Sequence, residues 1–104
     1  MNKVDMNRFV RNITCLCKEK NIYIGDLERE LGIAIGSLSR KKKGGSINLN
    51  IAYNISKILS ASLEELIESD IELELLIARK QEELKVVQYE IEELLKRTEV
   101  KDNE

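Results

Sequence analysis

Residues 22–45 read IYIGDLERELGIAIGSLSRKKKGG, and this stretch decides the fold. Leu27 and Leu31 lie four residues apart, so both side chains project from one face of a helix. Gly32 follows them and supplies the permissive backbone that a sharp turn requires. Leu38 then provides an apolar side chain with which a second short helix can pack back onto the first. The stretch therefore predicts a helix-turn-helix motif that ends in a run of basic residues.

The sequence around this motif shows the three- and four-residue spacing of apolar side chains that is typical of amphipathic helices. In the first predicted helix these side chains are Met6, Phe9, Val10, Ile13, Leu16 and Cys17. In the fourth they are Ile51, Tyr53, Ile55, Ile58 and Leu59. A capping box formed by Ser62 and Glu65 starts the fifth helix. The first four predicted helices cover approximately residues 5–20, 23–31, 34–42 and 48–59.

A longer helix is predicted after this domain. Residues 71–97 contain no Gly, no Pro and no strong capping residue, so nothing interrupts the helix. We therefore predict an all-α fold in which a five-helix domain, residues 1–69, precedes a long C-terminal helix, residues 70–99. Residues 100–104 are expected to form a disordered tail.

Apolar residues in the C-terminal helix recur with a heptad rhythm, as in a coiled coil. They are Leu73, Ile77, Leu84, Val87, Ile91 and Leu94. Such a stripe needs a partner, which is the five-helix domain, a second copy of the chain or a different protein. We predict a homodimer through these six residues. Because Lys80 occupies a core position of the seam, parallel, antiparallel and four-helix arrangements all remain open.

Composition narrows the class of protein. The chain has 104 residues, no Pro, no Trp and few aromatic residues, so its core must be filled mainly by Ile and Leu. Its apolar runs are far shorter than the roughly 20 residues that a bilayer requires, and the N-terminus lacks the apolar stretch of a signal peptide. We expect a cytoplasmic protein without a membrane segment.

The residues that usually carry enzyme chemistry are missing from the sequence. There is no histidine, no glycine-rich phosphate loop with its lysine and no nucleophile elbow. Cys15 and Cys17 would point about 200° apart on a helix, which disfavours a bond between them. We expect two reduced thiols, with redox sensing as the alternative, and no enzymatic activity, metal or cofactor.

The two parts of the chain carry opposite charge. Residues 1–60 hold 11 Lys or Arg against 5 Asp or Glu, whereas residues 61–104 hold 6 against 14. The net charge of −2 hides this division. Surface potential acts locally, so the basic part is suited to a polyanion, while the alternative is a mere drift of composition. The basic run of the helix-turn-helix motif favours DNA.

Several sequence elements together carry a family resemblance. They are Leu27, Leu31-Gly32-Ile33, Leu38-Ser39-Arg40, Gly44, Ile55, Ile58-Leu59 and Ser62-Leu63-Glu64-Glu65-Leu66. In this order and spacing, residues 9–67 resemble the DNA-binding domain of the Cro and lambda-repressor-like family, also called the xenobiotic-response-element family. The resemblance implies a sequence-specific transcriptional regulator, commonly a repressor, that occupies an operator as a dimer.

The sequence departs from the family pattern at four positions. Glu28 stands where the family usually has a small residue, and Ile24 stands where a polar residue is common. An arginine and a glutamate that pair in the familiar pattern are replaced by Cys17 and Lys42. Losing both partners is physically coherent, because losing one would leave a partly buried charge unpaired at a cost of about 3 to 5 kcal/mol. Lys42 is then available for a phosphate.

The second helix of such a motif enters the major groove, where its N-terminal part reaches base edges. The candidates for reading bases are Ile35, Ser37, Ser39 and Arg40. Arg40 alone among them can bind a guanine in bidentate fashion, and Ile35 can touch a thymine methyl group. The alternative is that Arg40 lies on a phosphate or in solvent.

Phosphate contacts are expected from the basic run and from the start of the next helix. The candidates are Lys41, Lys42, Lys43, Asn48 and Asn50. Four such contacts predict a slope of log affinity against log salt of roughly −3.6 per subunit. The alternative is that the lysines form a solvated face.

Two functions follow from these expectations. The first is a DNA-binding transcriptional regulator whose partner is double-stranded DNA and which acts as a dimer on two half-sites. The second is a protein-interaction module, such as an antitoxin or anti-regulator, whose C-terminal helix binds another protein while DNA binding is secondary. Ala34, Ile35 and Gly36 favour the second, because they offer few hydrogen bonds to a base.

Overall fold

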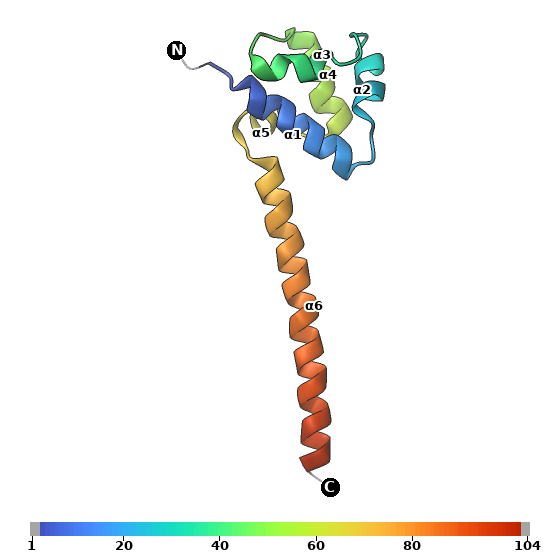
Figure 1. Ribbon diagram of the computed structural model, residues 1–104, viewed down its shortest axis with the longest axis vertical. Coiled ribbons are helices and arrows are strands. Elements are labelled where there is room, and N and C mark those ends of the chain that lie inside the picture. The colour runs from blue at the N-terminus through green and yellow to red at the C-terminus, as the bar shows by residue number, and fades with distance from the viewer. Residues whose placement is uncertain (1–2, 103–104) are drawn as a thin grey trace. The chain divides into compact units, whose positions relative to one another are not determined.

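The computed structural model describes residues 3–102, and the side chains of residues 3–98. Every regular element in this part of the chain is helical, which confirms the predicted all-α fold with a long C-terminal helix. The elements are α1 (Met6–Glu19), α2 (Ile24–Glu30), α3 (Ser37–Arg40), a 3₁₀ turn η1 (Lys41–Lys43), α4 (Leu49–Leu59), α5 (Leu63–Glu68) and α6 (Ile71–Asp102) (Figure 1). The chain divides into two compact units, one up to Glu72 and one from Leu73 onward.

Side-chain caps explain where three of the helices begin. The carboxylate of Asp5 accepts a hydrogen bond from the backbone N–H of Arg8 at the start of α1, at 3.1 Å. Asn48 caps α4 in the same manner. The Ser62 hydroxyl accepts from the N–H of Glu65 at 3.0 Å, so the predicted cap by Ser62 is confirmed. The Glu65 carboxylate reaches back to the Ser62 hydroxyl, at 3.3 Å, and not to the backbone N–H as in a full capping box. Local sequence therefore sets these boundaries.

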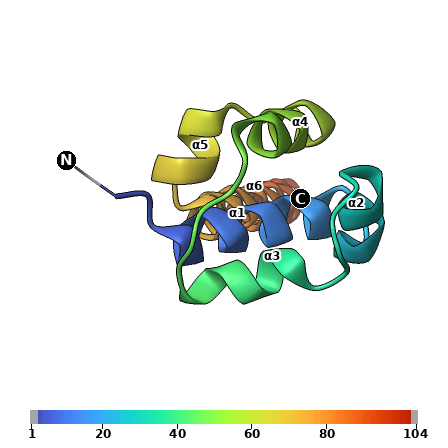
Figure 2. The ribbon, with the colours of Figure 1, turned by 90° about the horizontal axis from the view of Figure 1, so that it is seen from above.

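Helix α1 is the centre of the first unit. It packs against η1 on one side and against α4 and α5 on the other, as the view in Figure 2 shows. The buried apolar side chains are Met6, Phe9, Val10, Ile13, Cys17, Leu27, Leu38, Ala52, Ile55, Leu59, Ala61, Leu66 and Ile71. Tyr53, which we expected on the apolar face of α4, is instead 53% exposed, and the Lys57 ammonium lies 5.3 Å from its ring centroid. The phenol ring of Tyr53 thus lies outside the core.

A buried asparagine links α1 to the end of the domain. Asn12 is only 3% exposed, and its amide nitrogen donates to the carbonyl oxygens of Leu66 and Ser69, both at 2.8 Å. Its amide oxygen accepts from the N–H of Ile71 at 3.1 Å. The side chain therefore satisfies backbone groups that α5 and the following segment leave without helical partners. Asn12 was not predicted from the sequence, because the pattern of the first helix was defined by its apolar residues only.

Helix α6 belongs to the second unit from Leu73 onward and runs without interruption to Asp102. It therefore includes residues 100–102 of the segment that we expected as a disordered tail; residues 103 and 104 lie outside the described residues. The six heptad residues are between 47% and 59% exposed. No helix in the described part of the chain is both long and apolar enough to span a bilayer.

Candidate nucleic-acid interface

Two glycines shape the turn between α2 and the segment that follows it. Gly32 has φ 72°, in the left-handed region that favours glycine, at the position where the sequence predicted a sharp turn. Gly36 has φ 85° and is the N-cap of α3. The helix therefore begins at Ser37, three residues later than the expected start at residue 34. Residues 34–36 lie in the turn, because a left-handed residue cannot continue an α-helix.

Glu28 connects the two helices of the motif. It lies on α2 and is only 1% exposed. One carboxylate oxygen accepts from the backbone N–H of Gly36 at 2.9 Å, and the other accepts from the N–H of Leu38 at 3.0 Å. From the sequence, Glu28 was recognisable as a departure from the family pattern, but its role was not. The signal in the sequence was an acidic residue directly after the apolar Leu27, at a position where the family usually has a small residue.

The base-reading candidates differ in their surroundings. Ile35 is exposed in the turn, and Ser39 and Arg40 are exposed on α3. The hydroxyl oxygen of Ser37 is buried, and it has no hydrogen-bond partner among the described residues. Burial of the hydroxyl does not favour the expected contact of Ser37 with a base, which stays a prediction. The exposed candidates that remain are Ile35, Ser39 and Arg40.

The phosphate candidates also separate into two groups. Lys42 and Lys43 are exposed on η1. Lys41 is half-buried, and its ammonium donates to the carbonyl oxygen of Ser46 at 2.8 Å. The side-chain oxygen of Asn48 accepts from the backbone N–H of Asn50 at 2.7 Å, so that N–H already has a partner. The exposed side-chain amide of Asn50 stays a phosphate candidate. Lys42 and Lys43 are thus the most accessible cations of this group.

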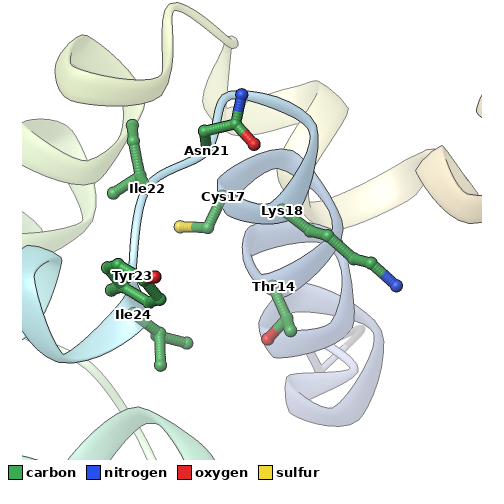
Figure 3. Close-up of a pocket in the computed structure, with 7 residues that line it drawn as sticks. All are labelled: Thr14, Cys17, Lys18, Asn21, Ile22, Tyr23 and Ile24. Carbon is green, nitrogen blue, oxygen red and sulfur yellow. The ribbon is translucent and has the colours of Figure 1, made fainter.

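A hollow lies at the start of α2, close to the loop after α1. It has a volume of about 340 Å³ and is lined by Thr14, Cys17, Lys18, Asn21, Ile22, Tyr23 and Ile24 (Figure 3).

Burial raises the pKa of the Cys17 thiol, and burial together with Glu72 raises the pKa of the Cys15 thiol. Both cysteines are free, and a raised pKa lowers the thiolate fraction that reacts with oxidants. No group of three potential metal ligands occurs among the described residues.

Comparison with known proteins identifies the domain. The family model of the Cro/C1-type helix-turn-helix DNA-binding domain matches residues 12–70. No curated protein and no solved structure gave a match. The matched segment covers more than half of the chain and contains the turn, α3, η1 and the contacts of Asn12 with Leu66 and Ser69. The chain therefore belongs to the Cro/C1-type helix-turn-helix DNA-binding family.

Proposed function

We propose that this protein is a sequence-specific transcriptional repressor of the cytoplasm that occupies an operator as a homodimer. The observation that carries the proposal is the exposed Arg40 on α3, followed within three residues by exposed Lys42 and Lys43. A guanidinium in the major groove can read a base, and ammonium groups beside it can bind phosphates, so this arrangement is suited to DNA. We expect the protein to act by binding alone, without enzymatic activity, a metal or a cofactor.

In the proposed complex, α3 lies in the major groove. Arg40 reads a guanine through two parallel hydrogen bonds, Ile35 contacts a thymine methyl group, and Ser39 donates to a base or a phosphate. Lys42 and Lys43 bind phosphates, and Lys41 adds positive charge while it supports the loop at Ser46. One subunit with so few base contacts binds weakly, so an operator with two half-sites about one helical turn apart is expected.

Arg40→Ala tests the reading of bases. We expect the affinity for DNA from the region upstream of the protein's own gene to fall roughly 5- to 150-fold, because a bidentate contact contributes about 1 to 3 kcal/mol of discrimination. Fluorescence anisotropy with specific and random duplexes measures the change. Arg40→Lys is the matched control for charge: it should keep the affinity for random DNA and lose the preference. If Arg40→Ala lowers the affinity for specific and random duplexes equally, Arg40 contacts a phosphate only.

The lysines on η1 are tested through salt dependence. Lys42→Ala combined with Lys43→Ala should make the slope of log affinity against log salt shallower by about 1.8 per subunit, from roughly 0.9 for each phosphate contact. Titrations at several potassium chloride concentrations give the slope. The control is Lys18→Ala with Lys20→Ala, which removes the same charge from exposed positions outside η1. Equal slopes in the two double variants would show that η1 does not bind phosphate.

Homodimerisation through α6 is the second part of the proposal. Isolated helices are marginal in water, and this one exposes an apolar seam over most of its length. A second copy offers the same seam, so two copies can bury both stripes at once. The residues proposed for the contact are Leu73, Ile77, Leu84, Val87, Ile91 and Leu94.

A second candidate function is a protein-interaction module such as an antitoxin. The specific observation in its favour is that α6 exposes apolar side chains beyond the heptad seam, namely Leu76, Val86, Tyr89 and Leu95. A different protein that covers this wider face would compete with the second copy. The discriminating observation is whether the purified chain alone shifts its upstream DNA in the presence of random competitor. Absence of a shift would favour the interaction module.

A further inference from the structure

We propose that Glu28 is a positioning residue, which holds the segment from Gly36 to Arg40 in the arrangement that binds DNA. The inference rests on the DNA-binding function proposed above and deepens it. Glu28 is on α2, contacts no DNA-facing side chain in the hydrogen bonds that the structure shows, and acts through the backbone of α3. Its role is to fix where Arg40 is presented.

The helical segment that carries Arg40 is too short to be stable on its own. Helix α3 has four residues, which is a single turn, and starting a helix is the costly step of helix formation. The first N–H groups of a helix have no intrahelical acceptor, and they usually bond to the side chain of the N-cap residue. The N-cap here is Gly36, which has no side chain to do so. An acceptor from elsewhere in the chain is therefore needed.

Glu28 supplies that acceptor from the preceding helix. Its two carboxylate oxygens bond to N–H groups that are two residues apart, Gly36 and Leu38. Two separate contacts restrain both the position and the rotation of the turn, whereas one contact would leave rotation free. The bond to Leu38 is buried, because Glu28 and Leu38 are both at or below 1% exposed, and the bond to Gly36 is partly buried. Water therefore competes little for these donors.

The chemistry of the side chain makes the arrangement specific to a carboxylate. A carboxylate accepts hydrogen bonds on both oxygens, whereas the amide of glutamine has one acceptor oxygen and presents an NH₂ group on the other side. In Glu28→Gln the NH₂ group would face an N–H donor, either that of Gly36 or that of Leu38. One of the two restraints is therefore lost, although the side chain keeps its size.

The sign of the effect separates positioning from electrostatics. A negative charge near bound DNA repels phosphates, so removal of a carboxylate by itself should raise the affinity for DNA. Glu30 is an exposed carboxylate on the same helix and has no hydrogen bond to α3 among those the structure shows. Glu30→Gln therefore measures the charge effect alone. Positioning by Glu28 predicts a change in the opposite direction.

The experiment compares Glu28→Gln with Glu30→Gln in the full chain, at a temperature where circular dichroism shows both variants fully folded. We expect the affinity of Glu28→Gln for its upstream DNA to fall at least 10-fold, with most of the preference over random DNA lost. Glu30→Gln should bind as the parent or more tightly. Equal or tighter binding by Glu28→Gln would overturn the inference. A lost preference for the upstream DNA would support positioning, because a residue that only stabilises the fold does not change the preference of a folded chain.

NMR of the parent chain provides a test that does not depend on the folding of a variant. The backbone ¹⁵N nuclei of Gly36 and Leu38 should each show scalar coupling across the hydrogen bond to the carboxyl ¹³C of Glu28. Absence of both couplings would overturn the inference. If the couplings are present but the parent chain binds no DNA, the proposed function fails and the DNA-positioning role fails with it. If the parent binds DNA and Glu28→Gln matches Glu30→Gln, the positioning role alone fails.

Discussion

Leu84→Glu is expected to convert the proposed homodimer into a monomer and to lower operator affinity by about 100-fold or more. The reason is that a carboxylate at a seam position would be buried without a partner in the dimer. Binding to two half-sites through linked domains gains about 10²- to 10⁴-fold over one domain, and this gain is lost with the dimer. Light scattering after size-exclusion chromatography gives the mass, and fluorescence anisotropy gives the affinity.

Val86→Glu is the matched control for this change. Val86 is 55% exposed and Leu84 is 56% exposed, and both substitutions replace an apolar side chain by glutamate in the same helix. Val86 lies two residues further along, which places it about 200° around the helix and outside the seam. It should leave the mass unchanged. Dissociation by Val86→Glu but not by Leu84→Glu would assign the contact to the opposite face of α6.

Truncation after Glu72 complements the point variants. Ile71 is buried and its N–H bonds to Asn12, so the cut has to follow the first residues of α6. The truncated chain should be folded and monomeric. If it remains a dimer, the contact lies in the helix-turn-helix domain. The remaining possibility is that the parent chain is a monomer whose seam packs on its own helix-turn-helix domain. Leu84→Glu would then leave the mass unchanged and lower the melting temperature of the domain.

Asn12→Ala is expected to lower the free energy of unfolding of the DNA-binding domain by about 3 kcal/mol. The change removes three hydrogen bonds and leaves the carbonyl groups of Leu66 and Ser69 and the N–H of Ile71 in a largely buried site. Buried polar groups without partners cost about 1 to 3 kcal/mol each, less where water enters the space left by the side chain. Urea titration gives the free energy, and the melting temperature should fall by roughly 10 to 20 °C.

Asn7→Ala provides the comparison, because Asn7 is an exposed asparagine on the same helix. It should change the free energy of unfolding by less than about 0.5 kcal/mol. Asn12→Asp is a further variant of equal size. Its carboxylate would face the carbonyl oxygens of Leu66 and Ser69 without a proton to donate, so it should destabilise the domain at neutral pH at least as much as alanine does. A stability close to that of the parent would show that these contacts contribute little.

Much of the fold was predictable from the sequence, since it depends on residues close together in the chain. The apolar spacing of α1 gave bounds of 5–20, against Met6–Glu19 in the structure. The cap at Ser62 was predictable because a hydroxyl three residues before a glutamate is typical of a helix start. The turn at Gly32 was predictable because a glycine directly after an apolar pair is typical of a turn that ends a helix. The family followed from these elements and their order.

The site was predictable only in part. Arg40, Lys42 and Lys43 are exposed where the basic run ends the second helix, as a charge pattern can indicate. The burial of the Ser37 hydroxyl was not predictable, because it depends on how one turn of helix lies against the rest of the domain. The late start of α3 also escaped, since the positive φ of Gly36 interrupts a pattern that otherwise continues smoothly from residue 34.

By itself, the sequence determined the helical elements, the helix-turn-helix frame, the family and the heptad pattern of the last helix, because each depends on periodicity or on groups a few residues apart. Only the tertiary structure decided which groups two buried polar residues bind. Asn12 bonds to backbone groups 54 to 59 residues away, and Glu28 bonds to groups 8 and 10 residues away across a turn. Hydrogen bonds of this kind depend on which backbone groups the packed helices leave without partners, and no local spacing encodes that.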